Sequence, residues 1–333
     1  MMNNSLEQVN SITGAVIDVG TNSVKLLVGE ICDGVVSPIY ETSYQTRLGS
    51  SLYSYGKLMP DSIASTCEAI NQLVHKARKL SSQFIRIFAT SAARDASNSS
   101  ELQQLVKTET GLDLEIISEE QEAIWAFDGI TQNLKPRIPI IVLDVGGGST
   151  QLSVGLAGTR PIFQSLDLGA VRLMHSFPRM HQDEPPGLAT MNECIGIVSS
   201  ILDTSIDLNI KAWINRFRSQ SVLFGAGGTA SVLASVKNGL KKFDRQLIDS
   251  TIISTPELLA MLEQLWTKSL KDRELIVGLP KNKADIIIFG VVIYFSFIKL
   301  FQFAELRPST RGIRFGALLD SVRAFYKNKP INF

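Results

Sequence analysis

The chain has 333 residues, of which 44% are hydrophobic and 20% are charged, and its formal net charge is +1. This length predicts two domains. Because the charge is nearly balanced, the protein has no overall positive potential that would attract nucleic acid or an acidic membrane, and neither is expected as a partner. The three cysteines lie far apart in sequence and form no metal-ligand spacing with histidine, which argues against a zinc site and a disulfide scaffold. The odd, sparse cysteine count fits a reducing cytoplasm, which is the expected location, and no signal peptide is apparent in the first eleven residues.

The first half of the sequence has the pattern of an α/β domain. Short apolar segments separated by turn residues predict three successive strands, and the spacing of Ile63, Ile70 and Leu73 predicts a long helix after them. The expected elements are strands at 15–18, 24–28 and 35–40, a helix at 62–80, a strand at 84–89, a helix beginning at 90–95, a strand at 114–117 and a helix at 119–129. This order favours a mixed sheet flanked by helices.

A proline-punctuated linker at 135–139 precedes a second half, so we expect domains at 12–134 and 135–333. The uncharged segment 286–298 has thirteen residues, short of the ~20 that span a bilayer, and predicts a buried core helix rather than a membrane anchor. The final helix is a candidate to pack back on the first domain. The other expected elements are strands at 140–144, 151–154, 162–166 and 222–225, a loop at 181–187, helices at 191–213 and 257–270, and a turn at 309–316.

The two halves repeat one turn. Residues 18–30 and 144–156 are identical at seven of thirteen aligned positions, and each copy opens with Asp-Val-Gly, at Asp18 and at Asp144. A match of this extent indicates a duplicated domain. One such turn alone would be interpreted as an ordinary hairpin with a glycine, but two matching copies favour a shared ligand site.

Both turns have the composition of a phosphate-binding loop. Glycine has no Cβ to keep a phosphate away from backbone amides, and neighbouring polar side chains add donors. Because a carboxylate repels phosphate, Asp18 and Asp144 indicate a bridging cation, for which Mg²⁺ is the expected ion. The candidate phosphate ligands in the two turns are Gly20, Thr21, Asn22, Ser23, Gly146, Gly147, Gly148, Ser149 and Thr150.

A third glycine-rich turn follows the predicted strand at 222–225 and precedes a helix. A helix N-terminus carries unpaired amides and a partial positive charge, so Gly227, Gly228 and Thr229 are further phosphate-binding candidates. Taken alone this turn is a weak signal, because glycine-rich turns between strands and helices are common.

The three turns, in this order, carry a resemblance to a known family. The chain resembles the exopolyphosphatase/guanosine pentaphosphate phosphohydrolase family in its short form, within the sugar kinase–actin–heat-shock chaperone superfamily. The resemblance implies an α/β fold of two duplicated ribonuclease-H-like domains, with mixed sheets flanked by helices and a cleft between them. The shared stretches are 15–25, 89–96, 116–123, 143–152, 168–173, 225–229 and 309–316.

The resemblance implies a Mg²⁺-dependent hydrolase that releases the terminal phosphate of polyphosphate or guanosine pentaphosphate. Glu122 stands at the position of the family's catalytic base, and a carboxylate near the turns can accept a proton from an attacking water. Arg94 matches a family arginine, and its guanidinium suits a bidentate phosphate contact. The alternatives are a solvated acid in a first helical turn for Glu122 and a surface ion pair for Arg94. The other basic candidates for phosphate binding are Lys25 and Arg47, followed by the weaker Arg172 and Arg314.

The sequence departs from the family near these residues. Gln151, the third catalytic candidate, replaces a glutamate expected to help hold Mg²⁺ or the attacking water. An amide is a weaker ligand and no base, although a glutamine can orient a water. Glu119 replaces a glycine, Gln121 replaces a glutamate, and Phe315 replaces a common glutamate. Glu119 or the neighbouring Glu120 could restore the lost carboxylate.

Two functions remain open at this point. The first is an exopolyphosphatase or guanosine pentaphosphatase, with the phosphate ligand in the cleft. The second is a diverged sensor that binds polyphosphate or a guanosine alarmone and hydrolyses it poorly, and a kinase is a less favoured third. The only other partner expected is a second copy of the chain, in a homodimer. No role is assigned to His75, His175 or His181, which lack metal-ligand spacing.

Overall fold

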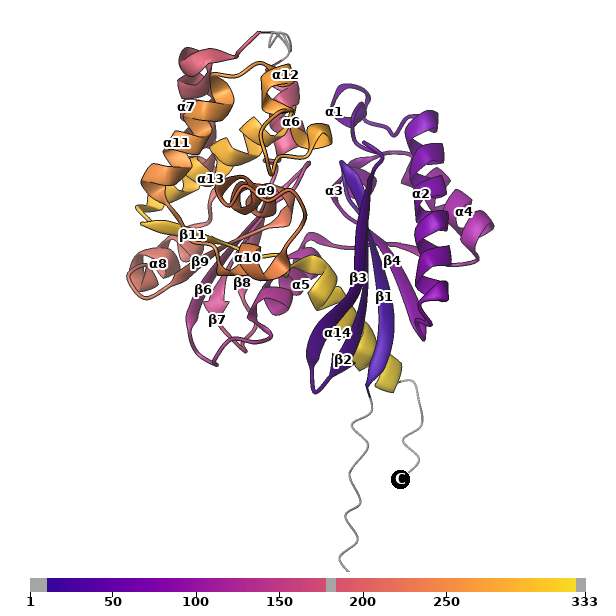
Figure 1. The fold of residues 1–333 in the computed structure, drawn as a ribbon. Coiled ribbons are helices and arrows are strands. Elements are labelled where there is room, and N and C mark those ends of the chain that lie inside the picture. The colour runs from indigo at the N-terminus through magenta and orange to yellow at the C-terminus, as the bar shows by residue number, and fades with distance from the viewer. Residues whose placement is uncertain (1–10, 178–183, 328–333) are drawn as a thin grey trace, which may run out of the picture.

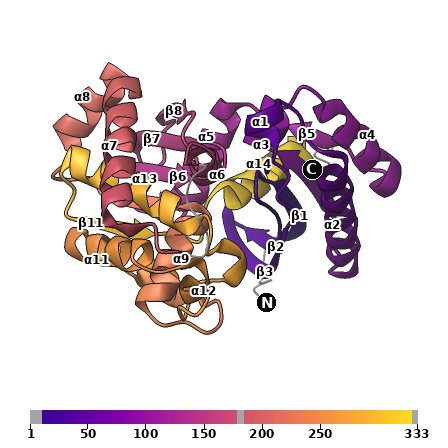
Figure 2. The same cartoon turned by 90° about the horizontal axis from the view of Figure 1, so that it is seen from above.

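The computed structural model describes residues 11–177 and 184–327. Part of the predicted loop at 181–187, including His181, lies outside these residues, and so do residues 1–10, where no signal peptide is expected. Within the described residues the chain forms two halves, each built on one sheet, which lie side by side in both views (Figure 1, Figure 2).

The first half contains a five-stranded mixed sheet with the order β3-β2-β1-β4-β5. β1 runs antiparallel to β2 and parallel to β4, so the sheet is mixed as predicted. The strands are β1 (Ile12–Val19), β2 (Ser23–Cys32), β3 (Val35–Gln45), β4 (Phe84–Ala89) and β5 (Leu114–Ile116). The helices are α1 (Leu52–Tyr55), α2 (Pro60–Lys79), α3 (Ser91–Asp95), α4 (Ser99–Thr110) and α5 (Glu119–Thr131).

The second half repeats this sheet and adds one strand, in the order β8-β7-β6-β9-β11-β10. β6, β7, β8, β9 and β11 therefore occupy the places of β1 to β5. The strands are β6 (Pro139–Val145), β7 (Thr150–Leu156), β8 (Ile162–Leu166), β9 (Val222–Ala226), β10 (Ile253–Ser254) and β11 (Glu305–Pro308). The helices are α6 (Ala170–His175), α7 (Gly187–Ser205), α8 (Leu208–Phe217), α9 (Gly227–Lys237), α10 (Arg245–Ser250), α11 (Thr255–Trp266), α12 (Leu270–Arg273), η1 (Lys281–Lys283), α13 (Ile287–Phe301) and α14 (Ile313–Lys327).

Several predicted helices end earlier than their apolar pattern does. The helix predicted at 191–213 is two helices, because Asp207 caps α8 by accepting a hydrogen bond from the Asn209 amide. The helix predicted at 257–270 stops at Trp266, and Ser269 caps α12 in the same way. The helix predicted to begin at 90–95 ends at Asp95, before the separate α4. The first two breaks therefore coincide with polar capping residues that compete for backbone amides, whereas Asn98 before α4 makes no side-chain cap.

The last helix, α14, packs on the first sheet, although it follows the second sheet in sequence (Figure 1). Phe315 and Leu318 join Val16 and Leu27 in one buried cluster. α14 also crosses α5 at backbone contact, because a Cβ at Gly316 would overlap the Trp125 carbonyl. α5 contributes to both cores: its Trp125 packs with the first sheet, and Phe127 and Ile130 pack with β6. α5 and α14 therefore form the base that joins the two halves (Figure 2).

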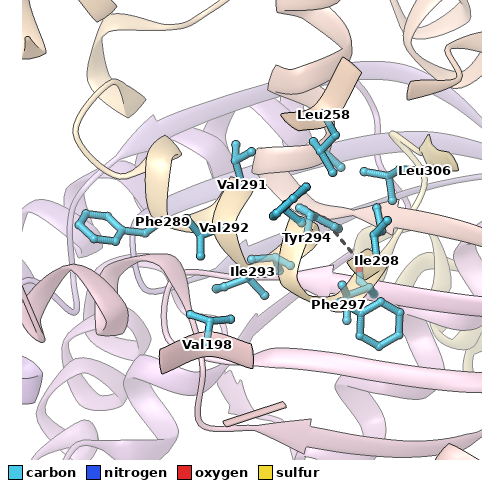
Figure 3. Packing of buried hydrophobic residues seen from close by; sticks show 14 of the residues in the cluster. Val198, Leu258, Phe289, Val291, Val292, Ile293, Tyr294, Phe297, Ile298 and Leu306 are labelled. Atoms are coloured by element: carbon cyan, nitrogen blue, oxygen red, sulfur yellow. Dashed lines mark hydrogen bonds between the residues drawn. The ribbon is translucent and has the colours of Figure 1, made fainter. Parts of the chain in front are cut away.

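The apolar segment at 286–298 forms most of α13, which is the buried core helix of the second half (Figure 3). No helix among the described residues is long and apolar enough to cross a membrane. The hydroxyl of Tyr294 lies within hydrogen-bond distance of the carbonyls of Leu143 and Ala226. These two residues directly precede Asp144 and Gly227, so α13 holds the ends of β6 and β9 where two of the predicted turns begin.

Candidate active site

A cleft with a volume of about 860 Å³ is lined by both halves of the molecule. It brings together Asp18, Glu122, Asp144 and Gln151, which come from β1, α5, β6 and β7. The predicted phosphate-binding residues that also line it are Gly20, Thr21, Asn22, Ser23, Lys25, Gly146, Gly147, Gly148, Ser149, Gly227, Gly228 and Thr229. All three predicted turns therefore open into one cavity.

The two aspartates occupy equivalent positions in equivalent hairpins. Asp18 lies opposite Lys25 in the β1–β2 ladder, and Asp144 lies opposite Gln151 in the β6–β7 ladder. Each aspartate is the residue before the last of its strand, so both carboxylates reach the edge of a sheet where the turn begins. Lys25 Nζ lies 3.7 Å from Asp18 Oδ2, whereas the partner of Asp144 is a neutral amide.

In the first turn the backbone carbonyls are bound away from the cleft. Gly20 donates to the Ser23 carbonyl at 3.0 Å, which closes the turn. The carbonyls of Thr21 and Asn22 accept from the Gly49 and Arg47 amides at 2.9 and 3.1 Å. Among the described residues, the amides of Thr21 and Asn22 donate to no other protein group. These amides are therefore available to an anion in the cleft.

The second turn is closed in the same way and is held by a helix. Gly146 donates to the Ser149 carbonyl at 3.0 Å. The Gly147 carbonyl accepts from the first turn of α6, through the Val171 amide at 2.8 Å. Over the described part of the chain, the amides of Gly147 and Gly148 have no protein acceptor. The second turn thus presents backbone amide donors to the cleft, and no side chain covers them because both residues are glycines.

The third turn is the open N-terminus of α9, an eleven-residue helix whose cap residue Ala226 supplies no side-chain acceptor. Gly227 has φ +85°, and a Cβ there would lie 2.7 Å from Asp144 Oδ1. A glycine is required at this position both by the left-handed backbone and by the aspartate beside it. The helix N-terminus therefore lies directly against the second aspartate.

Glu122 lies in the first turn of α5 and is only 8% exposed. The pKa of Glu122 is raised to about 8, chiefly by burial, with the Arg94 guanidinium opposing this rise and Asp144 and Asp18 adding to it. Arg94 Nη1 donates to Glu122 Oε2 and to the Ile117 carbonyl, both at 3.1 Å. Within the described residues, Arg94 is not part of the cleft lining. The structure places it as a support for Glu122 rather than beside the phosphate turns.

The carboxyl of Asp144 is also protonated more readily than usual. The pKa of Asp144 is raised to about 6, chiefly by burial, with Lys25 opposing this rise and the nearby Asp18 adding to it. Three carboxyl groups, those of Asp18, Glu122 and Asp144, therefore interact across one cleft. Their mutual repulsion adds to the effect of burial on the pKa values of Glu122 and Asp144.

Gln151 is buried, and its side chain is held by two serines. Its Nε2 lies 2.9 Å from Ser149 Oγ and 3.3 Å from Ser165 Oγ. Ser165 is its ladder partner on β8. The amide is therefore fixed beside Asp144 in the wall of the cleft rather than exposed to solvent.

Comparison with known proteins shows to which family a chain with this site belongs. The family model described as the Ppx/GppA phosphatase family matches residues 27–325. The chain belongs to the Ppx/GppA phosphatase family. It is 26% identical over 293 residues to Exopolyphosphatase 2 of Mycobacterium tuberculosis, an alignment covering 84% of this chain and 88% of that protein. It is 24% identical over 315 residues to the guanosine-5'-triphosphate,3'-diphosphate pyrophosphatase of Vibrio atlanticus, covering 93% of this chain and 59% of that one.

The solved structures agree with the two-domain actin-like fold. The crystal structure of the Aquifex aeolicus Ppx/GppA family member superposes with a TM-score of 0.78 at 25% identity, covering 96% of this chain and 100% of that chain. An exopolyphosphatase-like protein superposes with a TM-score of 0.82 at 22% identity, over 95% of this chain and 99% of that chain, and supports the fold alone.

Three other candidate residues lie away from the phosphate turns or are engaged elsewhere. Arg47 forms an ion pair with Asp285 at 3.0 Å and does not line the cleft in the described part of the chain. The Thr150 hydroxyl donates to the Leu168 carbonyl. Arg172 donates to the Gly148 carbonyl at 2.8 Å and pairs with Asp95 of the first half. It therefore holds the back of the second turn.

Arg314, one of the weaker candidates, does line the cleft. Its Nη1 donates to the Leu26 carbonyl at 3.1 Å and pairs with Glu41 at 3.0 Å, so it also fastens α14 to the first sheet. Phe315, which replaces a common family glutamate, is buried, with the Arg245 guanidinium 4.9 Å from its ring centre. His75 is exposed on α2, and His175 packs edge-on against Tyr53.

Sequence reasoning missed Lys283. It lines the cleft, and a Cβ on Gly228 would lie 3.0 Å from its Nζ. Burial, together with the nearby cations Lys25 and Arg314, lowers the pKa of Lys283 to about 8. Lys283 lies between other charged residues in an ordinary surface-like sequence, so no local pattern distinguishes it from a solvated lysine.

Proposed function

We propose that the chain hydrolyses the terminal phosphoanhydride bond of polyphosphate or of guanosine pentaphosphate. The observation that carries this proposal is the convergence of both Asp-Val-Gly turns and Glu122 on one cleft. The names of its relatives, an exopolyphosphatase and a guanosine-5'-triphosphate,3'-diphosphate pyrophosphatase, support the same reaction class. A cytoplasmic location and a homodimer belong to the same proposal, and sedimentation would test the dimer.

The unpaired amides of the turns would bind the terminal phosphates. Amides of Thr21 and Asn22 come from one wall, and those of Gly147 and Gly148 come from the other. The open N-terminus of α9 adds a third set of donors with a partial positive charge. Donors that are already in place stabilise developing charge on the phosphoryl oxygens without reorganising during the reaction.

The donor set in the cleft fits Mg²⁺. Among the described residues, no group of three or more His, Cys, Asp or Glu forms a metal cluster by itself. Mg²⁺ in phosphate sites commonly takes one or two carboxylates and completes its shell with phosphate oxygens and water. Asp18 and Asp144 supply two such carboxylates, and the pKa of Asp144, raised in part by Asp18, reflects a repulsion that a cation would relieve. When bound, Mg²⁺ would neutralise charge on the phosphates.

Glu122 would be the general base that takes a proton from the attacking water. A carboxylate at this position can accept the proton that the water loses as its oxygen bonds to phosphorus, while the remaining phosphate chain leaves with the bonding electrons. Arg94 would act as a positioning residue, because its hydrogen bond at 3.1 Å fixes the direction of the Glu122 carboxylate. Gln151, held by two serines, would orient the water or offer an oxygen to the cation.

The alternative function is a sensor that binds the same ligand and hydrolyses it poorly. One observation favours it: the residue opposite Asp144 is the amide Gln151, at a position where the resemblance implies a glutamate. The turns would bind phosphate in either case. The two functions therefore differ in turnover and not in ligand.

Phosphate release separates the two functions. The purified chain, with Mg²⁺, should release phosphate from polyphosphate or from guanosine pentaphosphate, and Glu122→Gln should reduce turnover by at least about 10²-fold. Glu101→Gln is the matched control, because Glu101 is an exposed acid in the first turn of α4 and does not line the cleft. Tight binding without release would favour the sensor. An unchanged rate in Glu122→Gln would remove this residue from the mechanism.

A further inference from the structure

α6 packs directly against the second phosphate turn. A Cβ on Gly169, the residue before α6, would lie 2.4 Å from the Gly147 carbonyl oxygen. Backbone amides at the start of α6 donate to the carbonyls of Gly146 and Gly147 at 2.8 to 3.1 Å. The next carbonyl of the turn, that of Gly148, accepts a hydrogen bond from Arg172 Nε at 2.8 Å. Three successive carbonyls of the turn are therefore bound by α6, and the last of them is bound by a side chain.

The bond from Arg172 to Gly148 sets the direction of one amide of this turn. The carbonyl and the N–H of a trans peptide point to opposite sides of the chain. The Ser149 amide shares its peptide with the Gly148 carbonyl, and both residues line the cleft. Arg172 is not part of the cleft lining within the described residues. Arg172 can therefore act on a bound phosphate through the Ser149 amide, and not by direct contact.

The same guanidinium reaches the first half of the molecule. Arg172 Nη2 lies 2.8 Å from Asp95 Oδ2, and the two side chains are 27% and 31% exposed. Asp95 Oδ2 also accepts a hydrogen bond from Ser91 Oγ at 3.2 Å. The ring of Tyr53 covers one face of the guanidinium, with its centre 4.5 Å from Arg172 Cζ. Contacts at two nitrogens and on one face therefore fix the plane of the guanidinium.

Asp95 belongs to the helix that also directs the general base. α3 ends with Arg94 and Asp95, and Arg94 Nη1 donates to Glu122 Oε2 at 3.1 Å. Adjacent residues of one short helix thus contact Glu122, from the first half, and Arg172, from the second. We propose that Asp95 and Arg172 are a pair of positioning residues, whose ion pair holds the second phosphate turn in a fixed place relative to the Glu122 carboxylate. This inference rests on the proposed function, because it explains how the general base and the phosphate turn of that reaction are aligned.

The pair should matter more to the rate than to stability. An ion pair between partly exposed side chains contributes little to the free energy of unfolding. The rate depends steeply on the positions of the reacting groups, and a displacement of about 1 Å can lower it by about 10²-fold.

A second acid beside Arg172 provides a matched control. Asp167 Oδ1 lies 3.1 Å from the same Arg172 Nη2, but the Asp167 side chain is 84% exposed. Asp167 precedes α6 in the second half of the molecule. It can therefore balance the charge of Arg172, but it cannot link Arg172 to α3.

The test measures phosphate release with Mg²⁺ present, from inorganic tripolyphosphate or, if only that is hydrolysed, from guanosine pentaphosphate. Asp95→Asn and Arg172→Lys should each lower kcat by about 10- to 10²-fold, with a smaller change in KM. A lysine keeps the charge, but one ammonium cannot bind the Gly148 carbonyl and the carboxylate in a fixed plane. The double variant should lose no more than the worse single variant, since both act through one contact. Asp167→Asn should stay within about twofold.

Several results would overturn the inference. Unchanged kcat in Arg172→Lys would remove the bond to Gly148 from the mechanism. Equal losses in Asp95→Asn and Asp167→Asn would mean that the acids only balance the charge of Arg172. Losses that add in the double variant would mean that Asp95 and Arg172 act separately. Losses of rate that follow losses of stability in urea unfolding would mean that the pair only holds the two halves together.

The inference and the proposed function fail in different ways. If the unmodified chain releases no phosphate from either substrate, the proposed function fails. Calorimetry with tripolyphosphate and Mg²⁺ then tests the positioning of the turn. Arg172→Lys should raise the Kd by about three- to tenfold, the scale of one hydrogen bond, and Asp167→Asn should not. The same Kd in both variants, or no binding by the unmodified chain, would overturn the inference as well.

Discussion

The two Asp-Val-Gly turns share a register but have different surroundings. Thr21 of the first turn corresponds to Gly147 of the second, and the structure explains the difference. A Cβ on Gly147 would lie 3.0 Å from Thr21 Cβ, and one on Gly148 would lie 2.9 Å from Thr21 Oγ1. The side chain of the first turn fills the space that side chains of the second would need. The glycines of the second turn therefore leave room for the first turn to pack against it.

Their electrostatics diverged as well. In the first hairpin a lysine lies opposite Asp18, with its Nζ 3.7 Å from the carboxylate. In the second hairpin an amide lies opposite Asp144, whose pKa burial raises to about 6. The negative charge of Asp18 is thus balanced by Lys25 of its own hairpin. The charge of Asp144 can be balanced only by Lys25 from the other wall or by a bound cation. The first wall adds the side chains of Thr21 and Asn22 to its backbone amides, and the second presents the amides of two glycines.

The largest expected effect comes from the aspartates themselves. Asp18→Asn and Asp144→Asn should each lower turnover by about 10²- to 10³-fold, the range for removing one preorganised electrostatic group. Asp144→Asn should also raise the Mg²⁺ concentration needed for half-maximal rate, because its hairpin offers no other charge. Steady-state rates over a Mg²⁺ titration would measure both. Asp33→Asn, in the exposed turn between β2 and β3, is the control. Unaltered turnover in either variant would remove that aspartate from the site.

The face-to-face packing of the turns predicts an unequal response to added methyl groups. In Gly148→Ala the new Cβ would overlap the hydroxyls of Ser91 and Tyr53, so the free energy of unfolding should fall by about 1–3 kcal/mol. In Gly20→Ala the nearest atom is the Ser23 carbonyl oxygen at 3.3 Å, and stability should change little. Urea unfolding of both variants would measure the difference. Equal stabilities would mean that the halves do not meet at this turn in solution.

The raised carboxyl pKa values predict a pH dependence in the protein without Mg²⁺. Burial raises the pKa of Glu122 to about 8 and that of Asp144 to about 6, so the folded state binds more protons than the unfolded chain. Stability should therefore fall as pH rises from about 4.5 to about 8, by at most ~1.4 kcal/mol per pH unit for each group that titrates. Glu122→Gln should flatten the upper part of this slope, and Mg²⁺ should reduce it. Stability that rises over this range would contradict the crowding of acids in the cleft.

The sequence predicts the two hairpin turns better than it predicts contacts between elements that are far apart in the chain. The duplication and both turns could be predicted because the same pattern of polar residues and glycines occurs in two segments of thirteen residues. The position of β11 was not predicted, because its four residues acquire their role only beside β9. Arg94 was expected at the phosphates but contacts Glu122, and Lys283 was not singled out. In both cases the decisive partners are supplied by another element, which periodicity and composition do not encode.

The smallest expected effect comes from a substitution at Gln151, where the second hairpin differs from the pattern that the family resemblance implies. Gln151→Glu should raise turnover by no more than about tenfold, a change of ~1.4 kcal/mol in the barrier. The serine hydroxyls that hold the amide, Ser149 and Ser165, can donate to a carboxylate as well, so the substitution should not disturb the wall. The added charge would strengthen the cation site beside Asp144 but would also raise the pKa of Glu122 further. The gain should therefore grow with Mg²⁺ concentration and with pH, and rates at pH 7 and pH 9 would reveal it. Reduced turnover under all these conditions would mean that the amide is a working part of the second wall and that the asymmetry of the hairpins is required for the reaction.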